Sequence, residues 1–184
     1  MKSAQYFAAQ KGRTMRKLLI ALIFIALGAH APFALSETSN DDMLAPIDLS
    51  SPEATAYSMM RAMYQGDADM VDQVFAEGAT LRRITDTGEL RPDGLERWRD
   101  WVGTLETGIA HEVLFGVETT TFGNLATVWA PFTITVNGDL VGCGVNQLTM
   151  AQQNDAWRII FGMDTNAPKE TCSGFKQAYL ARFH

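Results

Sequence analysis

The sequence predicts an α+β domain, in which N-terminal helices pack on a strongly curved antiparallel sheet to form a cone-shaped roll. Two observations carry this prediction. Apolar side chains recur at helical spacing between residues 51 and 105, and from His111 onward they recur at every second position. Helices followed by a long strand meander are typical of α+β folds. A strongly bent sheet leaves a cone lined by side chains, which is a natural pocket.

The first helix begins at Ser51, which can cap it, and Pro52 suits its first turn. Gly66 is the expected end. The apolar stripe of this helix consists of Ala56, Tyr57, Met60, Met63 and Tyr64.

A second, short helix is capped by Asp67 and ends before Gly78. Thr80 to Thr85 then reads as a strand with a short return at residues 89–91. Asp93 and Glu96 form a capping box for a third helix. Its apolar face consists of Leu95, Trp98, Trp101, Val102 and Leu105.

Four long strands in a meander follow the helices. Asn137-Gly138 and Asn154-Asp155 are turn signals, and Asn-Gly is the strongest short hairpin signal. The expected strands are Val113 to Phe122, Leu125 to Val136, Leu140 to Gln152 and Ala156 to Thr165. The cone-shaped domain therefore spans residues 52–166, and the tail, 167–184, is expected to dock as a short helix.

Residues 1–36 have the pattern of a secretory signal peptide: basic residues, an apolar run from Leu18 to Ala29, and small residues before the cut. We expect cleavage after Ser36, with a site near Ala31 as the alternative, and Met15 could be the true start. An uncleaved anchor is the competing interpretation, but His30 interrupts the run early. Residues 37–51 are expected to form a flexible leader. The sequence thus predicts export to the bacterial periplasm, with no stable membrane anchor after cleavage.

The charge of the exported portion restricts its partners. Of the 15 basic residues, five lie in the signal, so ten remain against 21 acidic residues, a net charge of −11. Such a chain repels phosphate backbones and anionic membrane surfaces, which excludes nucleic acid as a partner. Cys143 and Cys172 are the only cysteines, and an oxidising compartment favours a disulfide between them. No cluster of His or Cys suggests a metal, and no cofactor is expected.

Several motifs resemble the nuclear transport factor 2-like superfamily, which includes ketosteroid isomerases, scytalone dehydratases and SnoaL-like polyketide cyclases. The order of elements from Ser51 to Thr165 matches that cone-shaped α+β fold. The motifs look like an exported branch of the superfamily, and they are Val128-Trp129-Ala130-Pro131-Phe132, Cys143-Gly144-Val145-Asn146, Trp157-Arg158-Ile159, Asp164-Thr165 and Cys172. Because this fold hosts isomerases, dehydratases, hydrolases and binding modules, the resemblance implies little about the reaction.

The residues that such chemistry would need are not evident. The resemblance implies a Tyr of the first helix and carboxyl groups in the cone for an isomerase, and paired His residues for a dehydratase. Tyr57 or Tyr64 could supply the phenol, but Asp139 and Asp164 lie at a turn and at a strand end. We therefore assign no catalytic residue, with Tyr57, His111 and Asp164 as candidates if the protein is an enzyme.

A two-residue turn at Asn137-Gly138 would place Trp129 opposite Asn146, and the next turn would place Leu148 opposite Phe161. A single β-bulge would exchange the faces. Asn146 is a mid-strand amide among apolar neighbours, so it is either a ligand anchor or a structural amide. The predicted ligand-binding residues are Tyr57, Trp101, Trp129, Asn146, Leu148 and Phe161.

The leading hypothesis is an exported module that binds a small, largely apolar molecule in an apolar cone pocket. The alternatives are an isomerase- or dehydratase-type enzyme that uses acid/base residues in the cone, and a scaffold for a protein partner. A second apolar face that includes Phe132, Ile134 and Val145 predicts a homodimer. Arg82 and Arg83 could attract an acidic ligand, although strand alternation points one of them outward.

Overall fold

The structure is a computed structural model that describes residues 40–183. The predicted signal peptide and the cleavage site lie outside the described residues. The first elements are helices: α1 (Asn40–Met43), α2 (Pro52–Gln65), α3 (Ala68–Val74) and, after one strand, α4 (Leu95–Val102). Within residues 40–183, no helix is both long enough and apolar enough to cross a lipid bilayer.

Helix α2 begins and ends at the residues that the sequence marks. Helix α3 begins at its predicted cap but ends at Val74, because Phe75 is extended and begins a strand where the sequence predicts helix up to Gly78. The Ser51 side chain accepts a hydrogen bond from the Ala54 backbone N–H, and Gly66 closes α2 in the left-handed conformation. Asp67 caps α3 by accepting from the Met70 N–H at 2.9 Å. Helix α4 differs, because Gly94 is its N-cap and makes no side-chain cap bond. The expected cap, Asp93, instead accepts from the backbone N–H groups of Leu81 and Leu95.

The segment before α2 is packed, although the sequence suggests a flexible leader there. Met43 is buried in the core with 2% of its surface exposed. The Ser58 side chain accepts a bond from the Asp48 N–H and donates one to the Asp48 carbonyl. Gln65 donates to the Met43 carbonyl at 2.9 Å. From Met43 onward, the chain therefore belongs to the domain.

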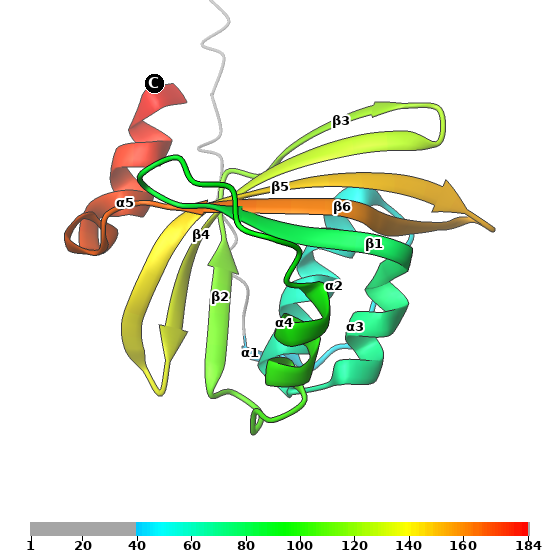
Figure 1. Cartoon of the computed structure of the whole chain (residues 1–184), viewed down its shortest axis with the longest axis horizontal. Coiled ribbons are helices and arrows are strands. Elements are labelled where there is room, and N and C mark those ends of the chain that lie inside the picture. Colours follow the sequence, from blue (N-terminus) through cyan, green and yellow to red (C-terminus); the bar gives the residue numbers. More distant parts are fainter. Residues whose placement is uncertain (1–39, 184) are drawn as a thin grey trace, which may run out of the picture. The chain divides into compact units, whose positions relative to one another are not determined.

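A curved sheet of six strands forms the other layer (Figure 1). Its strands are β1 (Phe75–Ile84), β2 (Ala110–Leu114), β3 (Glu118–Phe122), β4 (Leu125–Val136), β5 (Asp139–Gln153) and β6 (Ala156–Asn166). The order is β1-β6-β5-β4-β2, and β3 pairs with the first half of β4. The expected single strand from Val113 to Phe122 is thus two strands, broken at residues 115–117, which pair with different halves of β4. The sheet is mixed, since β1 runs parallel to β6 while the other pairs are antiparallel.

The core lies between α2, α3 and α4 and the concave face of the sheet, which bends around these helices in Figure 1. Its fully buried side chains include Met60, Met63, Val74, Leu148 and Ile159. Burial of one such side chain contributes about 1.5–3 kcal/mol relative to exposure. Side chains of the concave face thus contribute both to the core and to the wall of any cavity that lies beside the core.

Two β-bulges decide which side chains face the helices. Strands β4 and β5 follow the expected pairing at Thr135 and Leu140, and then shift by one residue at Val141, so Trp129 pairs with Gln147. A second shift, at Ile160, pairs Thr149 with Phe161. Each bulge inserts one residue and exchanges the faces beyond it. The pairings of Trp129 with Asn146 and of Leu148 with Phe161 are therefore wrong.

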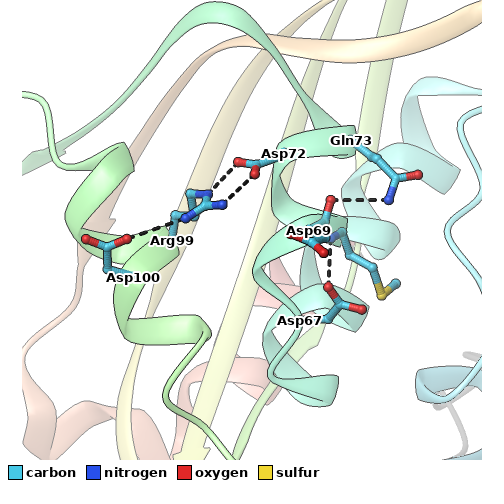
Figure 2. Close-up of polar contacts among 7 residues, drawn as sticks. Asp67, Asp69, Asp72, Gln73, Arg99 and Asp100 are labelled. Atoms are coloured by element: carbon cyan, nitrogen blue, oxygen red, sulfur yellow. Dashed lines mark hydrogen bonds and ion pairs between the residues drawn. The ribbon is translucent and has the colours of Figure 1, made fainter.

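Helix α4 is attached to α3 by one ion pair. The Arg99 guanidinium donates from Nε and Nη2 to the two carboxylate oxygens of Asp72, each at 2.6 Å (Figure 2). Asp100 lies 3.5 Å from the same guanidinium. A paired geometry of this kind is more directional than a single surface contact.

The C-terminal segment forms α5 (Cys172–Leu180), which contacts β4 and β5. Cys143 and Cys172 form a disulfide with Cα atoms 5.3 Å apart, as the sequence predicts. The Trp129 Nε1–H donates to the Tyr179 hydroxyl at 2.9 Å, and Phe115 packs edge-on against Tyr179. Helix α5 therefore lies on the outer side of the sheet, opposite α2.

Candidate functional site

A cavity of about 690 Å³ lies between the concave face of the sheet and helices α2 and α4. This volume suits a small organic molecule. The apolar lining comes from three Met side chains of α2, two Trp side chains of α4 and the bent half of β4. These residues are Met59, Met60, Met63, Trp98, Trp101, Phe132, Ile134 and Val136.

Three polar residues form a row across the concave face. Asn146 of β5 is paired with Asp164 of β6, which is paired with Arg83 of β1. The Asp164 carboxylate accepts from the Arg83 Nε at 2.8 Å and also from Nη2. This carboxylate raises the pKa of Arg83. All three residues line the cavity.

Glu112 of β2 also lines the cavity and completes a polar cluster on its floor. Its Oε1 accepts a hydrogen bond from the Asn146 Nδ2 at 2.7 Å. The side chain is half-buried and faces the cavity. Loss of hydration is the main cause that raises the pKa of Glu112 to about 7, and the charge of nearby Asp164 adds to it. The hydrogen bond from Asn146 and the charge of Arg83 lower this pKa, but by less. Near neutral pH this carboxyl is therefore present in both protonation states.

Glu112 and Asn146 belong to strands that are not neighbours, because β4 lies between β2 and β5. Glu112 is aligned with Ile134 and Gly142, whereas Asn146 lies four residues farther along β5. The bend of β5 closes this gap. Within the bend, Gly144 lies so close to β6 that a Cβ atom there would be 2.0 Å from the Thr165 carbonyl oxygen. Only glycine fits such an approach.

Sequence reasoning missed Glu112 because the strand was expected to begin at Val113. A signal was present. Ala110 and Leu114 are apolar and lie two residues on either side of Glu112, so a period of two places the carboxylate among buried side chains. The bulges also had a signal, since Gly142 directly follows the first, Gly162 lies two residues beyond the second, and glycine in a strand often marks a bulge.

Two of the six predicted ligand-binding residues line the cavity. Asn146 is 5% exposed and lies on the floor, while Trp101 is 38% exposed and lies at the edge. Asn146 fits both interpretations of the sequence, because its amide has a structural partner in Glu112 and also faces the cavity. Asp164, which the sequence suggests as a candidate acid, lies on the same face because of the second bulge.

The other four lie outside the cavity lining. Leu148 is fully buried in the core, and Tyr57 packs against the edge of the core, where burial raises its pKa. Trp129 lies on the outer face with Tyr179, and Phe161 shares that face because it pairs with Thr149. The two bulges are the reason for the positions of Trp129 and Phe161. Phe132 and Ile134, expected on a second face that would form a dimer, line the cavity.

His111 lies apart from this cluster. Its ring packs edge-on against Tyr64, with centroids 5.1 Å apart, and burial lowers its pKa. Its Nε2 is buried and has no hydrogen-bond partner in the described structure. His111 follows Ala110 and precedes Glu112 on β2, so strand alternation turns it away from the carboxyl cluster. Residues 40–183 contain no group of three or more His, Cys, Asp or Glu side chains placed to hold a metal ion.

No family model and no curated protein matches the sequence. Solved structures do match the fold. A proposed dehydratase of the nuclear transport factor 2-like family from Streptomyces avermitilis is 15% identical, covers 66% of this chain and 96% of its own, and has a TM-score of 0.52. A nuclear transport factor 2-like protein of unknown function from Pseudomonas putida is 17% identical, with 65% and 86% covered and a TM-score of 0.52.

A third structure, a protein of unknown function with a cystatin-like fold from Nostoc punctiforme, is 16% identical, with 63% and 88% covered and a TM-score of 0.51. At these identities the likeness concerns architecture, and function must be argued from the site. The chain has the nuclear transport factor 2-like fold.

Proposed function

We propose that the protein binds a small, largely apolar molecule in the cone cavity, and that Glu112 exchanges a proton with it in an isomerase- or dehydratase-type reaction. The observation that carries the proposal is the Glu112 carboxyl, which faces the cavity beside apolar side chains of β4 and has a pKa of about 7. An acid whose pKa lies near the working pH can serve as both proton acceptor and proton donor. A strongly perturbed carboxyl in a cavity is also a recognised mark of an active site.

The hydrogen bond from Asn146 gives the two Glu112 oxygens different roles. Oε1 is held by the Asn146 amide, whereas Oε2 has no hydrogen-bond partner among residues 40–183. Oε2 is therefore the oxygen available to a ligand. Ionised Glu112 can accept a proton from a carbon beside a carbonyl and return it to another carbon, which moves a double bond. Alternatively, Glu112 that has taken this proton can donate it to a hydroxyl group on the next carbon, so that the C–O bond breaks, water leaves and the electrons of the broken C–H bond form a C=C double bond.

The test compares the protein with its Glu112→Gln variant, using a β,γ-unsaturated cyclic ketone in deuterated buffer. We expect the protein to accelerate deuterium incorporation, measured by NMR. The variant should lose about 100-fold or more of this rate, the usual contribution of a general acid or base. Glu118→Gln is the matched control, because Glu118 is an exposed glutamate of β3 outside the cavity. Equal rates for Glu112→Gln and the control would remove Glu112 from the chemistry.

Binding without turnover is the second candidate function. One observation favours binding alone. Asp164, the other carboxylate of the cavity, accepts hydrogen bonds from Arg83 and so is not free to act as a second acid. Native mass spectrometry of protein from its own compartment would separate the two functions. A retained small molecule, with no proton exchange on it, identifies a binding module.

We also propose that the protein is exported and forms a homodimer. The signal pattern supports export, and the disulfide is compatible with export. Support for a dimer comes from exposed apolar side chains on β3 and β4, because Phe122 is 90% exposed, Leu125 52% and Trp129 42%. Light scattering at micromolar concentration tests the dimer, and Trp129→Gln should shift it toward a monomer. Detection in the periplasmic fraction of cells tests export.

A further inference from the structure

The basic residues of this acidic protein gather around its cavity. Outside the predicted signal the chain has ten basic and 21 acidic residues. Four of those ten line the one cavity described above, and they are Arg82, Arg83, Arg91 and Arg97. Only two acidic residues of the described part of the chain, Glu112 and Asp164, line it as well, so the local charge of the lining is opposite in sign to that of the protein as a whole and attracts negative ligands.

The four arginines differ in how far their charges are already neutralised. Arg83 is paired with Asp164, and Arg91 lies 3.2 Å from the Glu89 carboxylate. Arg82 donates from Nε to the Arg91 carbonyl at 3.0 Å.

Arg97 is the arginine that remains available. It makes no ion pair and no hydrogen bond within residues 40–183, and it is exposed at the edge of the cavity. Arg82 also lines the cavity, and Asp93, whose pKa the charge of Arg82 helps to lower, already accepts from the backbone N–H groups of Leu81 and Leu95. A guanidinium without a partner can bind a carboxylate through two parallel hydrogen bonds.

Helix α4 presents this arginine together with aromatic surface. Arg97 and Trp101 are four residues apart, so they lie on the same side of the helix, and Trp98 follows Arg97 directly. All three line the cavity. The Arg99–Asp72 ion pair on the other side of α4 holds this surface in place (Figure 2). The opening thus combines a positive group with an apolar platform.

The interior has the opposite character. Its walls are Met, Phe and Ile side chains, and its floor has Glu112 and the Asp164 carboxylate, which already neutralises Arg83. A negative group placed on the floor would meet these two carboxyls, and like charges in a poorly hydrated space repel strongly. A negative group is therefore stable only at the opening, with the apolar part of the molecule pointing inward.

We propose that the ligand is an amphipathic carboxylic acid, whose carboxylate binds Arg97 and Arg82 at the opening and whose apolar body extends toward Glu112. This inference rests on the proposed binding function and names the chemical class of the molecule bound. It gives the opening and the floor separate tasks: the arginines select the ligand, and Glu112 acts on its inner end.

The test uses two probes that differ only in charge, decanoate and 1-decanol, at pH 7.5 and low salt. Binding is followed by the fluorescence of Trp98 and Trp101, which line the cavity. We expect decanoate to bind at least about 10-fold more tightly than 1-decanol, since hydrogen bonds to a charged group are about twice as strong as neutral ones. We also expect higher salt to weaken only decanoate.

Variants assign the effect to the opening. Arg97→Gln should weaken decanoate about 10-fold and leave 1-decanol unchanged, and Arg82→Gln should act in the same direction. Lys169→Gln is the matched control, because it removes one exposed positive charge away from this cavity. Arg97 has no partner within the described residues, so its replacement leaves the fold intact.

The possible outcomes bear differently on the selection of an acid and on the proposed binding function. Equal affinities for decanoate and 1-decanol, or equal losses for both in Arg97→Gln, overturn the selection of an acid and leave the proposed binding of apolar molecules standing. If neither probe binds, the acid-binding inference and the binding function on which it rests are both overturned. Loss of proton exchange in Glu112→Gln with unchanged decanoate affinity would support both.

Discussion

Replacement of Glu112 by glutamine should remove one contribution to the pH dependence of the free energy of unfolding. That contribution arises because the Glu112 carboxyl lies on the cavity floor and resists ionisation there. The carbonyl oxygen of Gln can still accept the hydrogen bond from the Asn146 Nδ2 that Glu112 Oε1 accepts at 2.7 Å. What the variant loses is the ability to ionise. The comparison therefore isolates the cost of placing a charged carboxylate on this floor.

The magnitude follows from the two pKa values. An ordinary Glu has a pKa of 4.5, whereas burial raises that of Glu112 to about 7 in the folded protein. Below pH 4.5 the carboxyl is protonated in both states, and no stability is lost. As the pH rises past 4.5 the unfolded chain releases its proton while the folded protein keeps it until about pH 7. At about 1.4 kcal/mol for each pH unit, the folded protein loses up to about 3 kcal/mol across this interval.

The assay is urea unfolding of both proteins at pH 4.5 and at pH 8.5. His111 also titrates in this range; because its pKa is lowered in the folded protein, its contribution increases stability as the pH rises. Both proteins contain His111, so this contribution cancels in the difference. We expect the two free energies of unfolding to be similar at pH 4.5, with the variant more stable by about 3 kcal/mol at pH 8.5. A difference that is the same at both pH values would refute the raised pKa of Glu112.

Three further predictions concern residues of β5. Asn146→Ala removes the hydrogen bond that favours the ionised carboxyl, so the pKa of Glu112 should rise further above about 7, which carbon NMR of the glutamate carboxyls would detect. Replacement of Cys143 and Cys172 by Ser opens a crosslink that spans 29 residues and should cost about 2–4 kcal/mol in denaturant unfolding. Gly144→Ala places a Cβ atom 2.0 Å from a carbonyl oxygen of β6 and should cost at least about 2 kcal/mol in the same assay.

Each of these predictions has its own check. For the glycine, Gly174→Ala in α5 is the matched control, because no other atom lies within 4 Å of the new methyl group and alanine favours a helix by up to about 1 kcal/mol. A Gly144→Ala protein as stable as this control would contradict the close approach of β5 and β6. For the disulfide, the protein and its double Ser variant should be equally stable once a reductant is added. For Asn146, an unchanged Glu112 titration would show that the amide does not influence the carboxyl.

The sequence predicts the architecture well because the signals for it are local. The caps at Ser51 and Asp67 and the turn at Asn137-Gly138 lie where the structure has them. The site is harder to predict, because it depends on which face of each strand points inward. One extra residue at Val141 and another at Ile160 exchange those faces, and neither disturbs the alternation that the sequence displays.

The contents of the cavity were therefore only partly predictable. Asn146 and Trp101 lie on it as expected, whereas Trp129 lies on the outer face. Glu112 could have been found from its buried neighbours on β2. Its pairing with Asn146 could not, because it depends on the bend of β5 and not on sequence spacing. A raised carboxyl pKa is a property of the assembled fold.

The parallel pairing of β1 with β6 has a consequence for how the protein folds. Arg83 and Asp164 meet across this pair although 81 residues separate them in the chain. Pairings between such distant segments form slowly, because a long loop must close before any contact rewards it. The polar floor of the cavity thus cannot assemble until the last strand has been added to the first. Partly folded chains expose the edge of β1 in the meantime, and at this stage the protein is most prone to aggregation.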